Sequence, residues 1–490
     1  MPRATKIVAT IGPASTEPDV LARMIAAGVD VVRMNFSHGT AADHALRADR
    51  VRTAARNAGR EVALMGDLQG PKIRVGKFEG GRVTLESDAS FVLDASFEGM
   101  GDIDRVGLDY KELPRDVKRG DVLLLNDGLI EVVVDRVEGP RIVTTVKVGG
   151  ELSNNKGINR KGGGLTAPAL TLKDMEDLKT AMRLGCDYIA VSFPKSATDM
   201  AMARLLANAA ADEAKAPHPY LIAKIERAEA IPALQEILDA SDGIMVARGD
   251  LAVEVGNAAV PALQKRMIKM ARASNKLAIT ATQMMESMIV NAIPTRAEVS
   301  DVANAVLDGT DAVMLSAETA SGRYPVAVVQ AVSDIVTAAD ESETVELDSE
   351  FLHKTFARVD QSIAYGALFT AYHLRCKAIV ALTDSGSTAL WMSRHDVDVP
   401  IFALTPRLPT LRKLALFRNV RAFELEENFD RDAALGEAVQ LLLRKTVVAS
   451  GDLIVLTIGE PMGQAGGTNT LKIVKVGELL VKSVETVPDA

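Results

Sequence analysis

Short apolar runs alternate with longer amphipathic segments along the first 340 residues of the chain. Eight of these runs have the length and the β-branched content of buried strands, at residues 6–11, 29–35, 61–67, 186–193, 221–226, 243–247, 277–282 and 312–316. Segments with apolar residues at helical spacing lie between the runs or after the last one, at 40–57, 172–184, 261–274, 297–307 and 325–339. Eight strand–helix repeats predict an α/β fold of the (β/α)8 TIM-barrel type, whose active site forms at the carboxyl ends of the strands.

The stretch 220–250 is the clearest unit of this pattern. Its first strand alternates, so that Lys224 and Glu226 project to the same face. A helical segment follows, and the chain then returns as a second strand that ends at Arg248-Gly249-Asp250. Parallel strands joined by a crossover bring these ends together. Two carboxylates beside one ammonium indicate either a metal or anion site or an ordinary ion pair at the rim of the sheet.

The third repeat is interrupted by a segment with a different period. From about residue 76 to residue 164 the apolar positions alternate, in runs at 83–85, 91–93, 122–125, 130–134 and 142–148. Asn126-Asp127-Gly128 is a typical hairpin sequence. We therefore expect a small antiparallel β domain, a β-barrel inserted into the (β/α)8 barrel and standing over its mouth as a lid.

A second α/β region follows an acidic stretch at 340–346, which is typical of a linker. Its predicted strands are 378–382, 401–404, 422–425, 453–458 and 471–476, and they favour an open-sheet α/β domain. The expected domains are a barrel from 1–72 and 167–340, an inserted β lid at 73–166 and a C-terminal regulatory domain at 341–490.

Composition narrows the class of protein. The 490 residues are 48% hydrophobic and 25% charged, with a formal charge of −9 and no long basic run, which argues against nucleic acid or an acidic membrane as a partner. Cys186 and Cys376 lack metal-type spacing, which fits a reducing compartment. No apolar stretch has the length of a membrane span, and we expect a cytoplasmic protein.

Several motifs at the predicted strand ends occur in a characteristic order. They are TKIVATIGPAS at 5–15, RMNFSHG at 33–39, GDLQGPKIR at 66–74, AKIE at 223–226, DGIMVARGDL at 242–251, ATQMMESM at 281–288, PTRAE at 294–298 and DVANAVLDG at 301–309. With these motifs the chain resembles the pyruvate kinase family over almost its whole length. The family has the same architecture of a barrel, an inserted β lid and a C-terminal α/β domain.

The resemblance implies phosphoryl transfer from phosphoenolpyruvate to ADP, giving pyruvate and ATP in the last step of glycolysis. This chemistry depends on positioning anions and neutralising charge on the moving group. The resemblance implies that Glu226 and Asp250 hold Mg²⁺ or Mn²⁺, with substrate oxygens and water completing the coordination. It also implies that Lys224 stabilises the transferring phosphoryl group.

The implied catalytic residues are Lys224, Arg33 and Thr282, and the implied substrate contacts are Arg33, Lys224, Gly249, Asp250 and Thr282. Arg33 would clamp phosphate. The backbone N–H groups at Gly249 and Asp250, at the start of a short helix, would receive the substrate carboxylate. The proton donor to enolpyruvate stays open among Thr282, Ser316 and an ordered water. Glu318 is at least as compatible with a structural role as with a catalytic one.

The implied nucleotide contacts are Asn35, His38, Arg74 and Lys156. Each has a simpler interpretation: Asn35 as a turn cap, His38 as a solvated loop residue, and Arg74 and Lys156 as solvated lid charges. The sequence that follows Lys156 departs from the usual family pattern.

A monovalent-cation site is implied by Asn35, Ser37 and Asp67, which match K⁺ ligands of the family. Members that need K⁺ carry a glutamate where this chain has Lys72, and Thr-Lys where it has Leu68-Gln69. Because a fixed ammonium in this pocket supplies the charge that K⁺ supplies elsewhere, we expect Mg²⁺ dependence without a strict K⁺ requirement.

The turn after residue 382 matches the family's phosphate loop for allosteric effectors, through Thr383, Ser385, Gly386, Ser387 and Thr388. A plain βα turn with an N-cap is the alternative. The Gly-rich stretch 463–469 would close over a sugar-phosphate or AMP effector. Ser387 stands where a basic residue is expected for fructose bisphosphate, which argues against that ligand.

The resemblance further implies a homotetramer that binds phosphoenolpyruvate and ADP or ATP. One rival interpretation is a Mg²⁺-dependent barrel aldolase or lyase acting on pyruvate-like acids, which has no use for Arg74, Lys156 or a lid. Another is a sugar-phosphate sensor on an inactive barrel, which would require the loss of Lys224 or the carboxylates.

Overall fold

The computed structural model describes residues 3–342, 355–428, 430–462 and 466–478. Its central element is a closed eight-stranded barrel with the strand order β1-β16-β15-β14-β13-β12-β3-β2. The strands are β1 (Lys6–Thr10), β2 (Val31–Asn35), β3 (Ala63–Asp67), β12 (Tyr188–Val191), β13 (Tyr220–Ile225), β14 (Gly243–Ala247), β15 (Leu277–Ala281) and β16 (Ala312–Leu315). The predicted (β/α)8 barrel is confirmed.

Close packing of parallel strands sets the position of the site. Lys224 on β13 pairs with Met245 on β14, and Ala247 at the end of β14 pairs with Ala281 on β15. A Cβ atom at Gly243 would lie 2.7 Å from the Leu277 Cβ, so β14 approaches its neighbour this closely only because glycine is present. The carboxyl ends of β13, β14 and β15 therefore lie together.

The helices of the barrel include all five predicted segments. They are α1 (Pro18–Ala27), α2 (Ala41–Asn57), α4 (Leu172–Arg183), α5 (Ala197–Ala214), α6 (Leu234–Ala240), α7 (Arg248–Val255), α8 (Val260–Ala273), α9 (Arg296–Leu307), α10 (Ala317–Ala320) and α11 (Pro325–Ser342). Single turns η2 (Ala228–Ala230), η3 (Asn257–Ala259) and η4 (Glu286–Ile289) extend the loops. Helix α4 begins with a capping box, in which Thr171 and Asp174 satisfy each other's backbone N–H groups.

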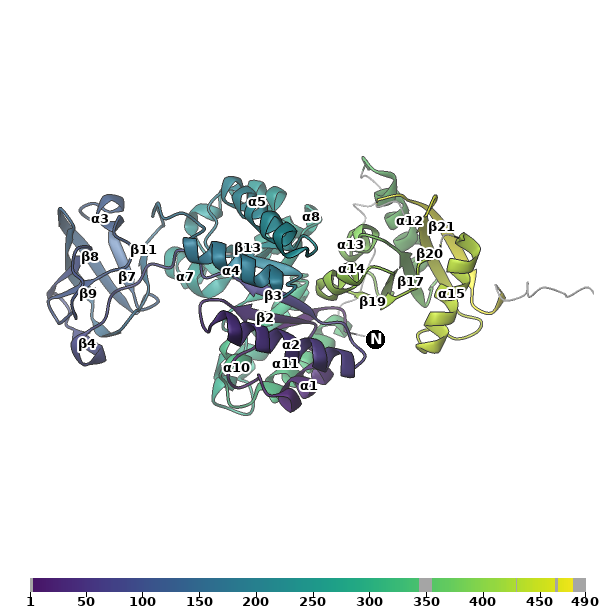
Figure 1. The fold of residues 1–490 in the computed structure, drawn as a ribbon, viewed down its shortest axis with the longest axis horizontal. Coiled ribbons are helices and arrows are strands. Elements are labelled where there is room, and N and C mark those ends of the chain that lie inside the picture. Colours follow the sequence, from purple (N-terminus) through teal and green to yellow (C-terminus); the bar gives the residue numbers. More distant parts are fainter. Residues whose placement is uncertain (1–2, 343–354, 429, 463–465, 479–490) are drawn as a thin grey trace, which may run out of the picture. The chain divides into compact units, whose positions relative to one another are not determined.

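The inserted segment forms two small sheets around its own core (Figure 1). One pairs β4 (Arg82–Leu85) with β10 (Gly150–Ser153), and the other has the order β11 (Ile158–Arg160), β7 (Val122–Leu125), β8 (Ile130–Glu138), β9 (Arg141–Val148), β5 (Ser90–Asp94) and β6 (Arg105–Gly107). The turn η1 (Glu79–Gly81) and helix α3 (Leu113–Asp116) complete it. The hairpin at Asn126–Gly128 is confirmed, with positive φ at all three residues. A wholly antiparallel arrangement was wrong at the edge, because β5 and β6 run parallel.

The C-terminal region contains an open five-stranded sheet, as predicted. Its order is β19 (Val420–Glu424), β18 (Ile401–Thr405), β17 (Ala378–Leu382), β20 (Leu453–Gly459) and β21 (Thr468–Lys475), and only β21 runs antiparallel to its neighbour. The helices are α12 (Val359–His373), α13 (Ser387–Ser393), α14 (Leu408–Lys413) and α15 (Arg431–Arg444), with the turn η6 (Leu414–Leu416). Buried residues of α15 join the sheet in one apolar core.

The chain forms two compact units. One contains residues 1–33, 45–65 and 284–490, and the other contains 34–44 and 66–283. The domain boundaries expected from the sequence stay a prediction. Part of the expected linker is helical, because α11 continues to Ser342; residues 343–346 lie outside the described part of the chain.

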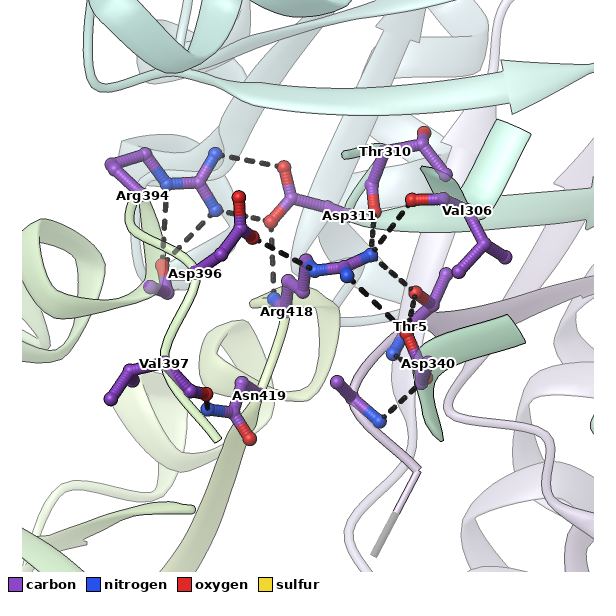
Figure 2. A network of polar contacts seen from close by, with 12 residues as sticks. Thr5, Val306, Thr310, Asp311, Asp340, Arg394, Asp396, Val397, Arg418 and Asn419 are labelled. Carbon is purple, nitrogen blue, oxygen red and sulfur yellow. Dashed lines mark hydrogen bonds and ion pairs between the residues drawn. The ribbon is translucent and has the colours of Figure 1, made fainter. Parts of the chain in front are cut away.

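A buried polar network occupies the first unit (Figure 2). Asp311, next to the start of β16, accepts a hydrogen bond of 2.8 Å from Nη1 of Arg394 and another from Nη2 of the same side chain. Figure 2 shows Asp311 between the side chains of Arg394 and Arg418. Arg418 donates to the Thr5 hydroxyl at 2.7 Å and lies 3.3 Å from Asp340. The network joins the C-terminal sheet to the amino-terminal ends of barrel strands.

Candidate active site

The ammonium of Lys224 is the centre of the site. It lies 3.0 Å from Glu226 and 3.2 Å from Asp67 at the end of β3, and it donates a 2.8 Å hydrogen bond to the Ser192 hydroxyl. Ser192 in turn donates to the backbone oxygen of Leu68 at 2.6 Å. The predicted common face of Lys224 and Glu226 is therefore present, and the ends of three strands contribute to one cluster.

Glu226 is 2% exposed and is fixed by a backbone donor. The N–H group of Phe193 donates to its Oε2 at 3.0 Å, from a residue with φ +56°, a conformation that few non-glycine residues adopt. Burial raises the pKa of the Glu226 carboxyl, the Lys224 ammonium opposes this shift, and the Asp250 and Asp67 carboxylates add to it. A divalent cation would relieve this concentration of negative charge.

Asp250 pairs with Lys72. The Lys72 Nζ lies 3.0 Å from Asp250 Oδ1 and 3.7 Å from Asp127 in the lid hairpin. Burial lowers the pKa of the Lys72 ammonium, but attraction to Asp250, Asp127 and Glu226 outweighs burial, and the pKa is raised overall. Lys72 is thus a permanent cation among the carboxylates of the site.

The start of α7 faces the end of β15. The N–H group of Gly249 donates to the Thr282 hydroxyl at 2.8 Å, and that hydroxyl donates to the backbone oxygen of Ala281. Thr282 has φ +69°, and Arg248 holds its carbonyl oxygen with a 2.7 Å hydrogen bond. A short helix does begin next to Gly249, as predicted, but Thr282 already occupies this N–H group in the structure.

The contacts of the loop after β2 fit both the simpler and the functional interpretation of Asn35 and His38. Asn35 accepts a hydrogen bond from the N–H group of Ser37 at 3.1 Å, which is the geometry of a turn cap, and His38 is exposed. A backbone hydrogen bond from Phe36 to Asp67 places this loop beside the end of β3. In the other unit, Arg33 is 9% exposed and donates to the Thr10 hydroxyl at 3.0 Å.

The two predicted lid cations lie on backbone segments that pair with each other. Arg74 forms a β-bridge with Gly157, the residue after Lys156, and donates to the backbone oxygen of Asn155 at 3.0 Å. Arg74 and Lys156 are both half-buried.

Glu318 has the contacts of a structural residue. It is 2% exposed and accepts hydrogen bonds from the N–H groups of Met285, at 3.2 Å, and Ser316, at 2.6 Å. The structure thus supports its structural interpretation. Ser316 stays one of three candidates for the proton donor.

The cluster can hold a metal only together with a ligand. Within the described ranges, no group of three or more His, Cys, Asp or Glu side chains is arranged to bind an ion unaided. Asp67, Glu226 and Asp250 nevertheless outnumber the two ammonium groups of Lys72 and Lys224 in one electrostatically coupled set. Hard carboxylate oxygens in excess over cations fit Mg²⁺ or Mn²⁺ whose remaining positions are filled by substrate and water.

The predicted effector loop lines a pocket of the C-terminal sheet. Thr383, Ser385 and Ser387 contribute to its wall, together with Gly466 and with Thr468 at the start of β21. Thr383 accepts a 2.9 Å hydrogen bond from the N–H group of Gly386, and the hydroxyls of Thr388 and Thr468 lie 2.7 Å apart. Residues 463–465 of the second loop lie outside the described residues.

Two contacts of the site were not predicted from the sequence. Ser192 and Phe193 lie just after β12, within the predicted fourth strand run of 186–193, and they hold Lys224 and Glu226. The position at a strand end was a usable signal for Ser192. No sequence pattern marks a backbone donor such as that of Phe193.

Comparison with known proteins gives a consistent result. The family model for the pyruvate kinase barrel domain matches residues 2–329, and that for the pyruvate kinase alpha/beta domain matches residues 361–474. Pyruvate kinase II of Salmonella typhimurium is 50% identical over 97% of this chain and 99% of its own length, and a pyruvate kinase of Haemophilus influenzae is 49% identical over 96% and 97%. The crystal structure of a pyruvate kinase from Cryptosporidium parvum covers 97% of this chain and 96% of its own, with a TM-score of 0.90 and 31% identity.

Among the described helices, none combines the length and the apolar character needed to cross a bilayer. The matches extend over the barrel and the C-terminal region alike, so the rival lyase and sensor interpretations are set aside. The chain belongs to the pyruvate kinase family and is a phosphotransferase that acts between phosphoenolpyruvate and ADP.

Proposed function

We propose that the cluster around Lys224 is where this chain performs the pyruvate kinase reaction. The observation that carries the assignment is the meeting of Lys224 and Glu226, at the end of β13, with Asp67, at the end of β3, and the electrostatic coupling of Asp250 to them. Glu226 and Asp250 would hold Mg²⁺ or Mn²⁺. When bound, the ion would neutralise phosphoryl oxygens and orient the substrate.

The remaining steps belong to the chain's own side chains. Lys224 would stabilise charge on the transferring phosphoryl group, because its ammonium is held in place by Ser192 and needs no reorganisation. Arg33 would clamp the substrate phosphate. The start of α7 at Gly249 and Asp250 would receive the substrate carboxylate, and Thr282 would release its bond from Gly249 to do so.

The lid would supply the nucleotide contacts. Arg74 and Lys156 lie on paired backbone segments of the lid, and each would contact a phosphate of the nucleotide. Asn35 and His38 on the loop after β2 would contact the nucleotide from the barrel. The monovalent-cation ligands Asn35, Ser37 and Asp67 would not need K⁺, because Lys72 provides a fixed charge beside Asp250.

The assignment is tested by replacing the central ammonium. Lys224→Met should lower kcat by at least about a thousandfold while the protein stays folded, because it removes charge stabilisation in the transition state. Lys179→Met, which removes an exposed lysine on α4 that pairs with Glu176, is the matched control. Pyruvate formation is followed through lactate dehydrogenase, with and without ADP and Mg²⁺. Near-normal kcat in Lys224→Met would refute the assignment.

We further propose that the pocket at Thr383–Thr388 binds a phosphorylated effector. Among the residues that the structure describes, its wall contains hydroxyls and the carboxylates of Asp384, Glu426 and Glu427 but no lysine or arginine, and Arg407 beside it is already paired with Asp384 and Glu427. This argues for a monophosphate rather than a bisphosphate. Glucose 6-phosphate, ribose 5-phosphate and AMP are the ligands to test as activators. A flat response to all three would contradict the proposal.

A homotetramer in the cytoplasm completes the proposal. Light scattering of the purified protein should give four times the mass of the chain, and a monomer would contradict this part.

A further inference from the structure

The chain leaves the lid through three consecutive glycines, here called the hinge, whose backbone conformation favours glycine. Gly162, Gly163 and Gly164 follow β11 and have φ angles of +80°, +79° and +93°. Residues with a side chain rarely adopt such φ angles. Three glycines in succession leave the backbone free to change direction. A segment of this kind needs external contacts if the lid is to have one defined position.

Two residues, Glu254 and Glu229, supply those contacts. Glu254, in α7, accepts a hydrogen bond from the Asn159 side chain of β11 at 3.5 Å, and its backbone oxygen accepts one from the Gly162 N–H group at 3.1 Å. Glu229, in η2, accepts a hydrogen bond from the Gly164 N–H group. A Cβ atom at Gly163 would lie 2.4 Å from Glu229 Oε2, so the hinge packs directly against this side chain.

Glu254 also contacts the loop that follows the metal carboxylate. Its Oε2 accepts a 2.8 Å hydrogen bond from the N–H group of Ala228, two residues after Glu226. Its helix α7 carries Asp250 one turn earlier. The side chains of Glu254 and Asn159 are 4% and 8% exposed, so water does not replace these contacts. One side chain therefore joins the lid strand, the loop after Glu226 and the helix of Asp250.

We propose that Glu254 is a positioning residue that fixes the lid relative to Glu226 and Asp250, the two carboxylates proposed to hold the metal. A nucleotide held by the lid is thereby aligned with the phosphoryl group. The part that concerns nucleotide rests on the proposed contacts of Arg74 and Lys156. Glu254 itself touches neither substrate nor metal in this account. It acts through Asn159 and Ala228.

The electrostatic environment of Glu254 makes its contacts with Asn159 and Ala228 dependent on pH. Burial raises the pKa of its carboxyl to about 7; the Ala228 N–H group, Arg227 and the Asn159 amide oppose this shift, and Glu229 adds to it. The carboxyl is neutral below that pH and ionised above it. Glutamine has the shape of the neutral form and does not titrate, so Glu254→Gln separates positioning from charge.

The main experiment compares KM for ADP with KM for phosphoenolpyruvate in Glu254→Ala and Asn159→Ala. Loss of a hydrogen bond at a buried acid corresponds to about a tenfold effect, and we expect KM for ADP to rise by that factor while KM for phosphoenolpyruvate changes less than about threefold. The double variant should be no worse than Glu254→Ala alone, because both changes break one contact. Glu298→Ala, which removes a helix-capping carboxylate remote in sequence from the lid, is the control and should move neither KM selectively.

The pH profile and the glutamine variant complete the test. The wild-type KM for ADP should change through about pH 7, and Glu254→Gln should keep a KM for ADP within about threefold of the low-pH value and lose that inflection. Hydrogen exchange at 156–164 should accelerate in Glu254→Ala. Equal rises of both KM values, additive single variants or unchanged exchange would overturn the proposal. If Glu254→Ala fails to fold, Glu254→Gln and Asn159→Ala give the same readouts.

Arg74→Ala, measured in parallel, distinguishes this proposal from the nucleotide assignment. An unchanged KM for ADP in Arg74→Ala would refute the role of Arg74. The hydrogen-exchange result would still decide whether Glu254 holds the hinge.

Discussion

The ammonium of Lys72 lies 3.0 Å from Asp250 and determines how the site balances its charges. Its pKa is raised by its carboxylate neighbours despite burial, so it stays charged throughout the physiological pH range. A covalently attached cation needs no binding free energy, whereas K⁺ must be taken from solution. Lys72, which stands where family members that need K⁺ carry a glutamate, is therefore expected to remove the need for K⁺.

Lys72→Glu should convert the enzyme to K⁺ dependence. The wild type should keep most of its activity when tetramethylammonium replaces K⁺ at equal ionic strength, while Lys72→Glu should lose at least about tenfold and recover when K⁺ is added. Steady-state kcat in the two salts is the measurement. A wild type that loses its activity in tetramethylammonium would refute the account of Lys72.

Ser192 illustrates a functional contact at the limit of sequence prediction. The alternation of the strand at 220–226 was sufficient to predict that Lys224 and Glu226 share a face. The acceptor that fixes Lys224 comes from another strand end, and its identity depends on how the loop after β12 turns. The pairing of Lys72 with Asp250 likewise depends on a contact between residues 178 positions apart.

Ser192→Ala should lower kcat with little change in KM for phosphoenolpyruvate. The variant removes a 2.8 Å hydrogen bond to a charged group, which contributes about 1.5–3 kcal/mol, so kcat should fall by roughly tenfold to a hundredfold. Ser321→Ala, which removes an exposed hydroxyl bonded to its own helix, should leave kcat unchanged. A kcat for Ser192→Ala equal to that of the control would contradict the positioning of Lys224.

Helices and strands differ in how well the hydrophobic pattern identified them. The eight barrel strands were found because each is a short apolar run buried on both faces. Helix α5 was not among the predicted segments, since its buried face consists largely of alanines, such as Ala203 and Ala207, that contrast little with its other residues. The parallel β5–β6 pair was missed because period-2 alternation does not indicate strand direction.

Helix α7 carries a pH-dependent contribution to stability through Glu254. Its carboxyl has a pKa of about 7 in the folded protein, against an ordinary value of 4.5, so the folded state binds more protons between these pH values. The contribution is present below about pH 4.5 and is lost as pH rises through 7, amounting to about 3 kcal/mol at most. From pH 5 to pH 8, the Tm of the wild type should therefore fall relative to the Tm of Glu254→Gln. A constant difference would contradict the raised pKa.

At the scale of the whole molecule, the buried network of Figure 2 connects distant parts of the sequence. Arg394 ends the helix α13 that begins at the effector loop, and its partner Asp311 precedes β16 of the barrel. Both side chains are at most 2% exposed. No short-range pattern predicts such a pair, because its two members are 83 residues apart.

Arg394→Met should destabilise the protein by about 3–5 kcal/mol, because it leaves Asp311 buried without its paired charge. The double variant Arg394→Met with Asp311→Leu should recover a large part of that loss, since an apolar pair carries no unpaired charge. Thermal and urea unfolding of both variants measures this. A double variant as unstable as the single one would show that the pair contributes more than charge balance.

The proposed reaction requires a divalent cation at the ends of β13 and β14, beside the transferring phosphoryl group. The most direct measurement is anomalous X-ray scattering from crystals grown with Mn²⁺ and phosphoenolpyruvate. We expect one Mn²⁺ bound by Glu226 and Asp250, with Lys224 contacting the phosphate. A Mn²⁺ ion bound elsewhere, or a phosphate that does not contact Lys224, would contradict it.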